Sequence, residues 1–532
     1  MRLTTQLLAA TALALSLGAT AASAKTLVYC SEGSPEGFDP ALYTAGTTFD
    51  ASSATVYNRL AEFELGTTNT RPGLAESWDV SEDGKTYTFH LRPDVKFQTT
   101  DFFTPTRPLN ADDVIFSFER QNSADNPYNA YVAGASWEYW NSMAMPDLIQ
   151  SMEKVDDMTV RITLNEPNAP FIANLAMPFA SILSKEYADQ LAESGNEAQL
   201  NQQPVGTGPF QFVAYQPDAV IRYKANPDYW AGKEPIDDLV FAITTDASVR
   251  QQRLLANECQ VMAYPNPADI ESLKGNSDLK VLEQEGLNVG YLAYNTKQEP
   301  FDDPKVRRAL NTAINKQAII DVVFQGSGEV AKNPIPPTMW SYNEETKDDP
   351  YDPEAAKTML QEAGVENLSM KIWAMPVQRP YNPNARRMAE LIQSDLSAVG
   401  VDAEIVSYEW GEYLERSKAE DRDGAVLLGW TGDNGDPDNF LGVLLSCDAV
   451  GNANRAQWCN EEFDAKINEA KTLTDQAERT PLYKEAQEIF KQEAPWATIA
   501  TSITFMPMRS NVTGYTQDPL GQHWFTGVDI EE

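Results

Sequence analysis

The chain has 532 residues, with 78 acidic and 41 basic side chains, a formal net charge of -37, four cysteines and two histidines. Its length exceeds that of one small domain, and its 42% hydrophobic and 22% charged composition excludes an intrinsically disordered protein. The acidity argues against binding to nucleic acid or anionic lipid, because phosphate groups attract clustered cationic side chains.

Residues 1–24 are predicted to be a cleavable secretory signal. Arg2 gives a basic start, an apolar run covers residues 7–15, and Ala22-Ser23-Ala24 supplies small residues before Lys25. The run is too short to span a bilayer, which takes about 18 or more apolar residues. Cys30 lies several residues after the cleavage point, so we predict no lipid anchor. The predicted location is the periplasm, and the predicted oligomeric state is a monomer.

Signals for strands and helices alternate along the rest of the chain. A hairpin is predicted over residues 79–91, with Asp83-Gly84 in its turn. Helices are predicted over residues 304–320 and over residues 384–399, the latter with an Asn cap and a stop at Gly400. Further strands are predicted over residues 26–29, 159–164, 210–215, 219–223, 239–243, 368–374, 401–408 and 425–428. This alternation predicts a mixed α/β fold.

An exported chain with an even number of cysteines favours disulfides over free thiols. The four are Cys30, Cys259, Cys447 and Cys459. Three connectivities are open, of which the short loop from Cys447 to Cys459 is the easiest to close, leaving Cys30 with Cys259. A zinc site is disfavoured because no Cys-x-x-Cys pair occurs and neither His90 nor His523 lies near a cysteine.

A secreted hydrolase is the competing class of function. The sequence has no Gly-x-Ser-x-Gly, no His-Glu-x-x-His and no phosphate-binding loop, and Gly206-Thr207-Gly208-Pro209 lacks the third glycine of a dinucleotide fingerprint. Paired carboxylates could support glycoside hydrolysis, but 78 acidic residues make such pairs unavoidable. We predict that the protein is no enzyme and uses no cofactor or metal.

The densest polar loop covers residues 429–440, directly after an apolar strand. An EF-hand is excluded because Gly435, Asp438 and Leu444 occupy positions that calcium binding gives to other residue types. Two interpretations remain: a solvated loop of Asx turns, or a site for an organic cation. In the second, Asp433 is the counter-ion and Trp430 an apolar wall.

A second candidate site lies in the proline-rich segment 373–383. Arg379 could grip a carboxylate with two hydrogen bonds, next to the amino end of the helix predicted from Asn384. The alternative is a surface arginine in a rigid turn. Likewise, Gly46-Thr47-Thr48 could offer backbone hydrogen bonds to a ligand or be an ordinary turn.

Several blocks of the sequence resemble the bacterial extracellular solute-binding proteins of the peptide and nickel class. The resemblance covers nearly the whole chain after the signal, in the blocks 25–38, 73–78, 111–118, 206–210, 375–387 and 429–440. The first and the last two of these blocks resemble the dipeptide-binding branch.

The resemblance implies an α/β periplasmic-binding-protein type II fold with mixed sheets, in which two lobes clasp the ligand and an extra domain is inserted. Lobe I would comprise residues 25–56, 208–285 and 505–532, the inserted lobe II residues 57–207, and lobe III residues 286–504. The same resemblance implies the bridges Cys30 to Cys259 and Cys447 to Cys459.

The implied function is capture of dipeptides for an inner-membrane ABC permease and its ATPase, with a chemoreceptor as a further candidate partner. Asp433 would pair with the peptide ammonium and Arg379 with the peptide carboxylate. Other implied ligand contacts are Gly46, Thr47, Thr48, Gly429, Trp430, Thr431 and Tyr381. Glutathione, haem or longer oligopeptides are alternative ligands within the class, although His90 and His523 are the sole candidate imidazole ligands and lie in no haem motif.

Overall fold

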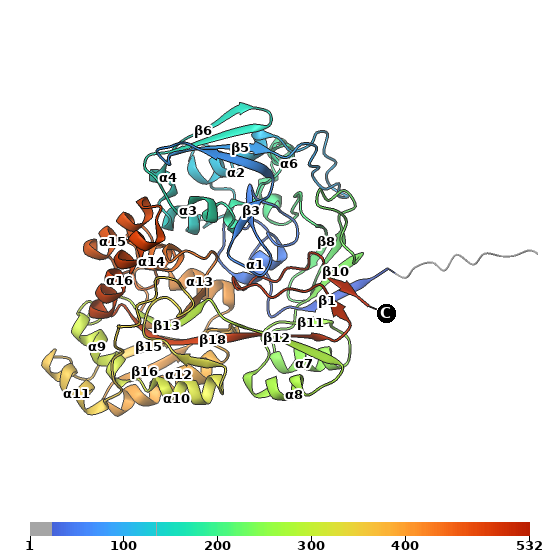
Figure 1. Ribbon diagram of the computed structural model, residues 1–532. Coiled ribbons are helices and arrows are strands. Elements are labelled where there is room, and N and C mark those ends of the chain that lie inside the picture. The colour runs from blue at the N-terminus through green and yellow to red at the C-terminus, as the bar shows by residue number, and fades with distance from the viewer. Residues whose placement is uncertain (1–23, 135, 532) are drawn as a thin grey trace, which may run out of the picture.

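A computed structural model describes residues 24–134 and 136–531 of the chain. The predicted signal lies outside these residues, apart from Ala24. Among the described helices, none combines the length and the apolar character needed to cross a membrane. Figure 1 shows helices and sheets mixed throughout the molecule, so the predicted α/β class is confirmed.

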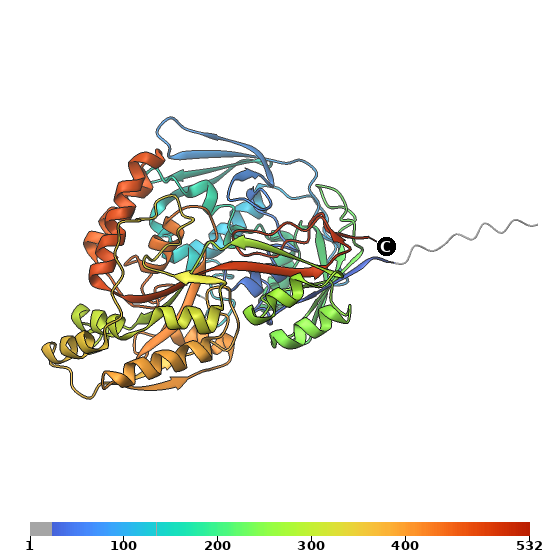
Figure 2. The same ribbon diagram turned by 60° about the horizontal axis from the view of Figure 1, so that its bottom comes forward.

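A twelve-stranded sheet extends through both halves of the chain. Its strands are β1 (Thr26–Cys30), β8 (Phe210–Gln216), β9 (Val220–Ala225), β10 (Asp238–Ala242), β11 (Val261–Met262), β12 (Leu279–Glu285), β13 (Asn288–Tyr294), β14 (Gly328–Val330), β15 (Ser369–Trp373), β16 (Asp402–Val406), β17 (Ala425–Thr431) and β18 (Trp496–Arg509). The order is β16-β15-β17-β13-β18-β11-β1-β10-β9-β8, and β12 and β14 also pair with β18. The long strand β18, red in Figure 2, joins the two halves because it pairs with both β11 and β13.

The predicted strands of this sheet are confirmed to within two residues at most ends. The exception is β17, which continues past residue 428 through Gly429, Trp430 and Thr431. These three residues pair with Gly290, Val289 and Asn288 of β13, so a segment that we expected in a loop is part of a central strand.

A separate four-stranded antiparallel sheet lies at the top of Figure 1. It has the order β4-β5-β7-β6, from β4 (Ala75–Val80), β5 (Thr86–Leu91), β6 (Ile149–Asp156) and β7 (Thr159–Leu164). The predicted hairpin is confirmed, since Trp78 pairs with Phe89 across a turn in which Gly84 has a φ of 69°. Helix α2 (Ala111–Asn122) packs on β6 and β7, and α6 (Lys185–Ser194) packs on α2.

Short elements surround this sheet and connect it with the rest of the molecule. They are α1 (Gly46–Ala51), β2 (Ala61–Phe63), β3 (Thr70–Pro72), α3 (Glu138–Ser142), α4 (Met145–Leu148), α5 (Phe171–Asn174), η1 (Pro178–Ala180) and η2 (Glu197–Asn201). Two further small strands near the carboxyl end, β19 (Val512–Thr513) and β20 (Asp529–Ile530), pair with each other.

Helices cover the large sheet. They are α7 (Ala247–Leu255), η3 (Pro267–Asp269), α8 (Ile270–Lys274), α9 (Pro304–Ala313), α10 (Lys316–Ile319), η4 (Ile320–Phe324), α11 (Pro353–Glu362), α12 (Ala385–Ala398), α13 (Trp410–Ser417), α14 (Asp438–Leu445), α15 (Glu461–Thr472) and α16 (Gln476–Glu493). The predicted cap of α12 is confirmed, because the Asn384 side chain accepts the Arg387 N–H at 3.0 Å. The prediction of a single helix over residues 304–320 is wrong, because the structure has separate helices there. The first helix ends at Ala313, and Asn315 caps a new helix.

Both predicted disulfides are present, with Cα atoms 5.8 Å apart for Cys30 and Cys259 and 4.5 Å apart for Cys447 and Cys459. The first bridge lies in a small apolar cluster with Leu254, Met262, Leu273 and Leu279, separate from the main hydrophobic core. It therefore ties β1 to the start of β11 beneath helices α7 and α8, within one half of the large sheet.

Candidate functional site

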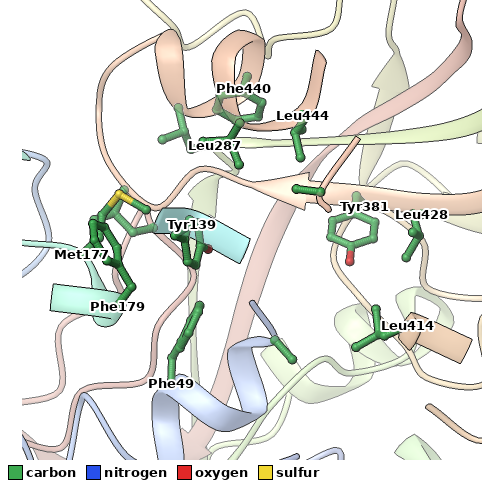
Figure 3. Packing of buried hydrophobic residues seen from close by; sticks show 14 of the residues in the cluster. Phe49, Tyr139, Met177, Phe179, Leu287, Tyr381, Leu414, Leu428, Phe440 and Leu444 are labelled. Carbon is green, nitrogen blue, oxygen red and sulfur yellow. The ribbon is translucent and has the colours of Figure 1, made fainter. Parts of the chain in front are cut away.

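Most of the predicted ligand residues lie in the wall of one cavity. The space between the atoms that line the cavity amounts to about 790 Å³, which includes space open to solvent. Seven of the predicted residues line it: Arg379, Asp433, Gly46, Tyr381, Gly429, Trp430 and Thr431. Its apolar lining includes Phe49 of α1, Tyr381, Leu414 and Leu428. Figure 3 shows Phe49 beside Tyr139, and Tyr381, Leu414 and Leu428 grouped together.

Asp433 is a buried carboxylate at the end of β17, with only 5% of its surface exposed. Its Oδ2 accepts a hydrogen bond of 2.6 Å from the Tyr139 hydroxyl. Burial raises the pKa of Asp433 to about 7, and no cationic side chain of the described residues compensates for it. A buried carboxylate without a counter-ion is costly, so this side chain is suited to receive a cation from a ligand.

The loop that carries Asp433 is rigid. The Asn439 side-chain oxygen accepts the Asp433 N–H at 2.8 Å and the Trp430 indole N–H at 3.0 Å. Asp436 accepts two hydrogen bonds, of 2.7 and 2.8 Å, from Arg479 of α16. The interpretation of residues 429–440 as a solvated loop is therefore wrong, because its acidic and amide side chains are buried, namely Asp433, Asn434, Asp436, Asp438 and Asn439.

Arg379 supplies the opposite charge and is 6% exposed. Its Nη1 donates to Glu32 at 2.8 Å and to the Gln378 carbonyl at 3.0 Å. Within the described part of the chain its Nη2 has no hydrogen-bond partner. The interpretation as an exposed surface arginine is wrong, since the guanidinium is buried against Glu32 with one amino group free for an anionic ligand.

Two glycines allow Tyr381 to lie directly on the central strands. A Cβ atom added at Gly429 would come within 2.2 Å of the Tyr381 ring, and one added at Gly290 within 2.3 Å of the Tyr381 carbonyl oxygen. These two glycines face each other across β13 and β17. Because neither glycine has a side chain, Tyr381 packs directly on both strands and lines the cavity together with Arg379.

The Gly429→Ala variant is expected to lower the free energy of unfolding by about 1–3 kcal/mol, because the added methyl group overlaps the Tyr381 ring. Denaturant titration followed by tryptophan fluorescence would measure the change. Gly275→Ala is the matched control, since its new Cβ would meet nothing closer than 3.4 Å. Equal stability of the Gly429 variant and this control would contradict the packing described here.

Thr47 and Thr48 are the two predicted ligand residues that do not line this cavity. Thr47 lines a neighbouring chamber rather than this cavity. Thr48 is fully buried, and its hydroxyl accepts the Glu36 N–H at 3.1 Å. The Thr48 side chain thus supports the turn after Glu32 and does not face the cavity.

No motif in the sequence indicated the contacts that helix α3 makes with lining residues of the cavity. Tyr139 of α3 reaches Asp433, and the adjacent Glu138 forms an ion pair with Lys418. The same Glu138 oxygen lies 3.7 Å from Nη2 of Arg455, which lines the cavity. These contacts join parts of the chain that are about 300 residues apart, and the segment around α3 contains no motif that would have marked them.

The two histidines and the acidic clusters offer no metal site in the described part of the chain. His90 pairs with Asp79 at the protein surface, at 2.9 Å. His523 is buried, with its Nδ1 2.7 Å from Asp50 and 2.8 Å from the Tyr29 hydroxyl. Neither histidine lines the cavity.

Comparison with known proteins assigns this architecture to a family. The model of the bacterial extracellular solute-binding proteins, family 5 Middle, matches residues 69–452. A dipeptide-binding protein of Escherichia coli strain K12 is 57% identical over 515 residues, which is 96% of each chain. Heme-binding protein A of Haemophilus influenzae is 50% identical over 514 residues, covering 96% of this chain and 94% of that protein.

A solved structure has a similar fold. The crystal structure of a dipeptide-binding protein from a Pseudoalteromonas species in complex with Met-Leu superposes with a TM-score of 0.92 at 41% identity, covering 95% of this chain and 100% of that one. The predicted type II periplasmic-binding-protein fold is thereby confirmed. This chain belongs to the bacterial extracellular solute-binding proteins of family 5.

Proposed function

We propose that this protein captures dipeptides in the periplasm and delivers them to the permease of an ABC importer. The observation that supports this proposal most strongly is the pair of buried, opposite charges in one cavity wall. Asp433 has no counter-ion among the described residues, and Arg379 has a free amino group. A zwitterionic peptide carries an ammonium at one end and a carboxylate at the other, which complements both.

In this proposal, the fixed positions of the two charged residues select ligands of one length. Asp433 pairs with the α-ammonium and Arg379 with the α-carboxylate, while backbone groups of Gly46 and of residues 429–431 hydrogen-bond the peptide. An extended chain grows by about 3.3–3.6 Å per residue, so one additional residue would displace a terminus from its partner. Side chains would contact the largely apolar walls, which permits many dipeptides to bind.

Closure around the ligand would involve three lobes with the bounds 25–56, 208–285 and 505–532 for the first, 57–207 for the second and 286–504 for the third. Contacts from Tyr139 to Asp433 and from Glu138 to Lys418 cross between the second and third of these lobes. Closing without ligand would bury the Asp433 charge unpaired. A dipeptide supplies the missing cation and so shifts the population towards the closed form.

Several other ligands of the class fit the cavity less well. Neither His90 nor His523 lies in its wall, so the cavity offers no imidazole to haem iron. Glutathione and longer oligopeptides place their charged termini further apart than a dipeptide does, so a site that holds both termini of a dipeptide would leave one of theirs unpaired. For the same site, we propose binding without catalysis and no resident cofactor, with a monomer as the working form and a chemoreceptor as a further partner.

The apparent affinity for dipeptides is expected to depend on pH. Burial raises the pKa of Asp433 to about 7, whereas a peptide α-ammonium loses its proton near pH 8. The association constant should therefore rise from about pH 5.5 to about 7.5, as Asp433 ionises, and fall above about pH 8, as the ligand loses its charge. Calorimetry at about pH 6 should also record proton release on binding.

The matched control for this pH profile is the Asp433→Asn variant, which should lose the rise on the acidic side. This control distinguishes the titration of Asp433 from that of Glu36 and Asp518, because burial raises the pKa of Glu36 to about 8 and the pKa of Asp518 to about 6. A constant affinity of the unaltered protein between about pH 5.5 and 7.5 would contradict the assignment of Asp433.

The ligand class can be tested on protein as it is purified. We expect mass spectrometry of the small molecules released by denaturation to find a mixture of dipeptides, because the two charged termini that Asp433 and Arg379 hold are common to every dipeptide. A tripeptide, glutathione or haem as the dominant retained molecule would overturn the proposal. The same protein unfolded and refolded without ligand provides the blank.

A further inference from the structure

A second chamber adjoins the cavity proposed to bind dipeptides, and most of the charged groups in its lining are acidic. The two share Arg379 and Trp410 in their walls. The second chamber encloses about 1200 Å³ between atoms, including space open to solvent. Its charged lining consists of four carboxylates and the one guanidinium, from Glu36, Asp218, Glu409, Glu415 and Arg379.

Three buried polar atoms of residues in this lining have no hydrogen-bond partner among the described residues. The Thr47 hydroxyl belongs to a side chain that is 3% exposed, and the free Nη2 belongs to Arg379, which is 6% exposed. Oε2 of Glu36 is a third such atom. Unpaired buried polar groups cost free energy, so their presence in one wall indicates that a ligand group completes them.

The chamber also has apolar side chains in its lining. They include Leu42, Val377 and Trp410. Trp410 already packs against the Arg379 guanidinium, with the charge centre 5.2 Å from its ring. Lysine and arginine have apolar stems that cover such surfaces while the cationic end stays among polar groups. Walls of this kind therefore match a long cationic side chain better than a short one.

We propose that this chamber is a subsite for the cationic side chain of the residue that carries the ligand's carboxylate. The inference rests on the proposed function, because Arg379 holds that carboxylate at the boundary between the two cavities. A lysine or arginine side chain starting there enters the chamber along Trp410 and ends near Glu36 and Thr47. Dipeptides with lysine or arginine at the carboxyl end are then preferred ligands.

The charge state of Glu36 is compatible with this role. Burial, with Glu138 close by, raises the pKa of Glu36 to about 8, and Lys418 and Arg455 oppose that rise. Glu36 is therefore largely neutral while the chamber contains no cation. An arriving ammonium or guanidinium stabilises the ionised carboxylate, which gives the ion pair without a permanent buried charge.

Calorimetry of the full-length mature protein with four dipeptides tests the subsite. Ala-Lys is compared with Ala-norleucine, which has the same stem without the charge, and with Lys-Ala, which has the same charge at the other residue. Ala-Ala reports on the binding of the termini alone. We expect Ala-Lys to bind about tenfold more tightly than Ala-norleucine, equivalent to about 1.4 kcal/mol, and Lys-Ala to show no such gain.

The Glu36→Gln variant should abolish this preference and leave the affinity for Ala-Ala unchanged. Glu412→Gln is the matched control, because Glu412 lies on the neighbouring helix α13 but pairs at the surface with Arg416. Equal binding of Ala-Lys and Ala-norleucine, or an equal gain for Lys-Ala, would overturn the subsite. Failure of Ala-Ala itself to bind would instead overturn the proposed function, so the two failures are distinguishable.

Discussion

The Asp433→Asn variant is expected to bind a free dipeptide at least about 100-fold more weakly than the unaltered protein. Removing one partner of a buried ion pair costs about 3–5 kcal/mol, and about 1.4 kcal/mol corresponds to each tenfold change in affinity. The loss should be large here because the site offers the ligand ammonium no second carboxylate among the described lining residues of this cavity. Titration calorimetry with Ala-Ala, on protein refolded without ligand, measures the effect.

The same substitution should stabilise the ligand-free closed form, which distinguishes a lost contact from a misfolded protein. The folded-state pKa of Asp433, about 7, lies above the value of about 3.9 for an unfolded chain. The folded protein therefore holds its proton longer, and stability is lost as the pH rises from about 4 to about 7. Asparagine does not ionise, so the variant should not lose stability in this way as the pH rises. It should therefore melt at a higher temperature than the unaltered protein at about pH 7.5.

Asp402→Asn is the control for Asp433, since it removes the same charge from an exposed position on strand β16. It should change neither the affinity nor the melting temperature measurably. An Asp433 variant that binds Ala-Ala as tightly as this control would remove Asp433 from the site.

The second large effect is expected from Arg379. A single substitution would leave Glu32 buried at 2% exposure without its cation, so the cleaner variant is the double change Glu32→Gln with Arg379→Gln. We expect this variant to bind Ala-Ala about 100-fold or more weakly, because the peptide carboxylate loses its charged hydrogen-bond donor. Glu32→Gln alone serves as the reference and should retain most of the affinity.

A comparison of free and amidated dipeptides assigns this loss to the ligand's carboxylate. The unaltered protein should prefer Ala-Ala over its amide strongly, whereas the double variant should bind the two alike. Continued discrimination between the two ligands by the double variant would contradict the assignment of Arg379.

Elements with a local cause could be predicted from the sequence. The Asp-Gly turn at residues 83–84 and the Asn384 cap depend on residues next to each other in the chain, and both are present in the structure. The break after Ala313 depends on Asn315 capping a second helix, but the apolar spacing continued across it and indicated one helix.

The burial of the site depends on distant parts of the chain and could not be predicted from local patterns. The loop at residues 429–440 has the composition of a solvated turn, yet Arg479 pairs with Asp436 and Tyr139 of helix α3 donates a hydrogen bond to Asp433. The local chemistry of Asp433 and Arg379 left a ligand contact as one of two interpretations for each residue, and the resemblance to a family favoured that interpretation. Thr48, predicted along with them, is turned away because its hydroxyl accepts the Glu36 N–H.

The central claim is that both charged ends of an intact dipeptide are recognised. The most direct test is calorimetric titration of refolded, ligand-free protein with Ala-Ala, N-acetyl-Ala-Ala and Ala-Ala amide, followed by analysis of the recovered peptides. We expect tight binding of free Ala-Ala alone and its recovery without cleavage. Comparable binding of either blocked peptide, or release of free alanine, would contradict it.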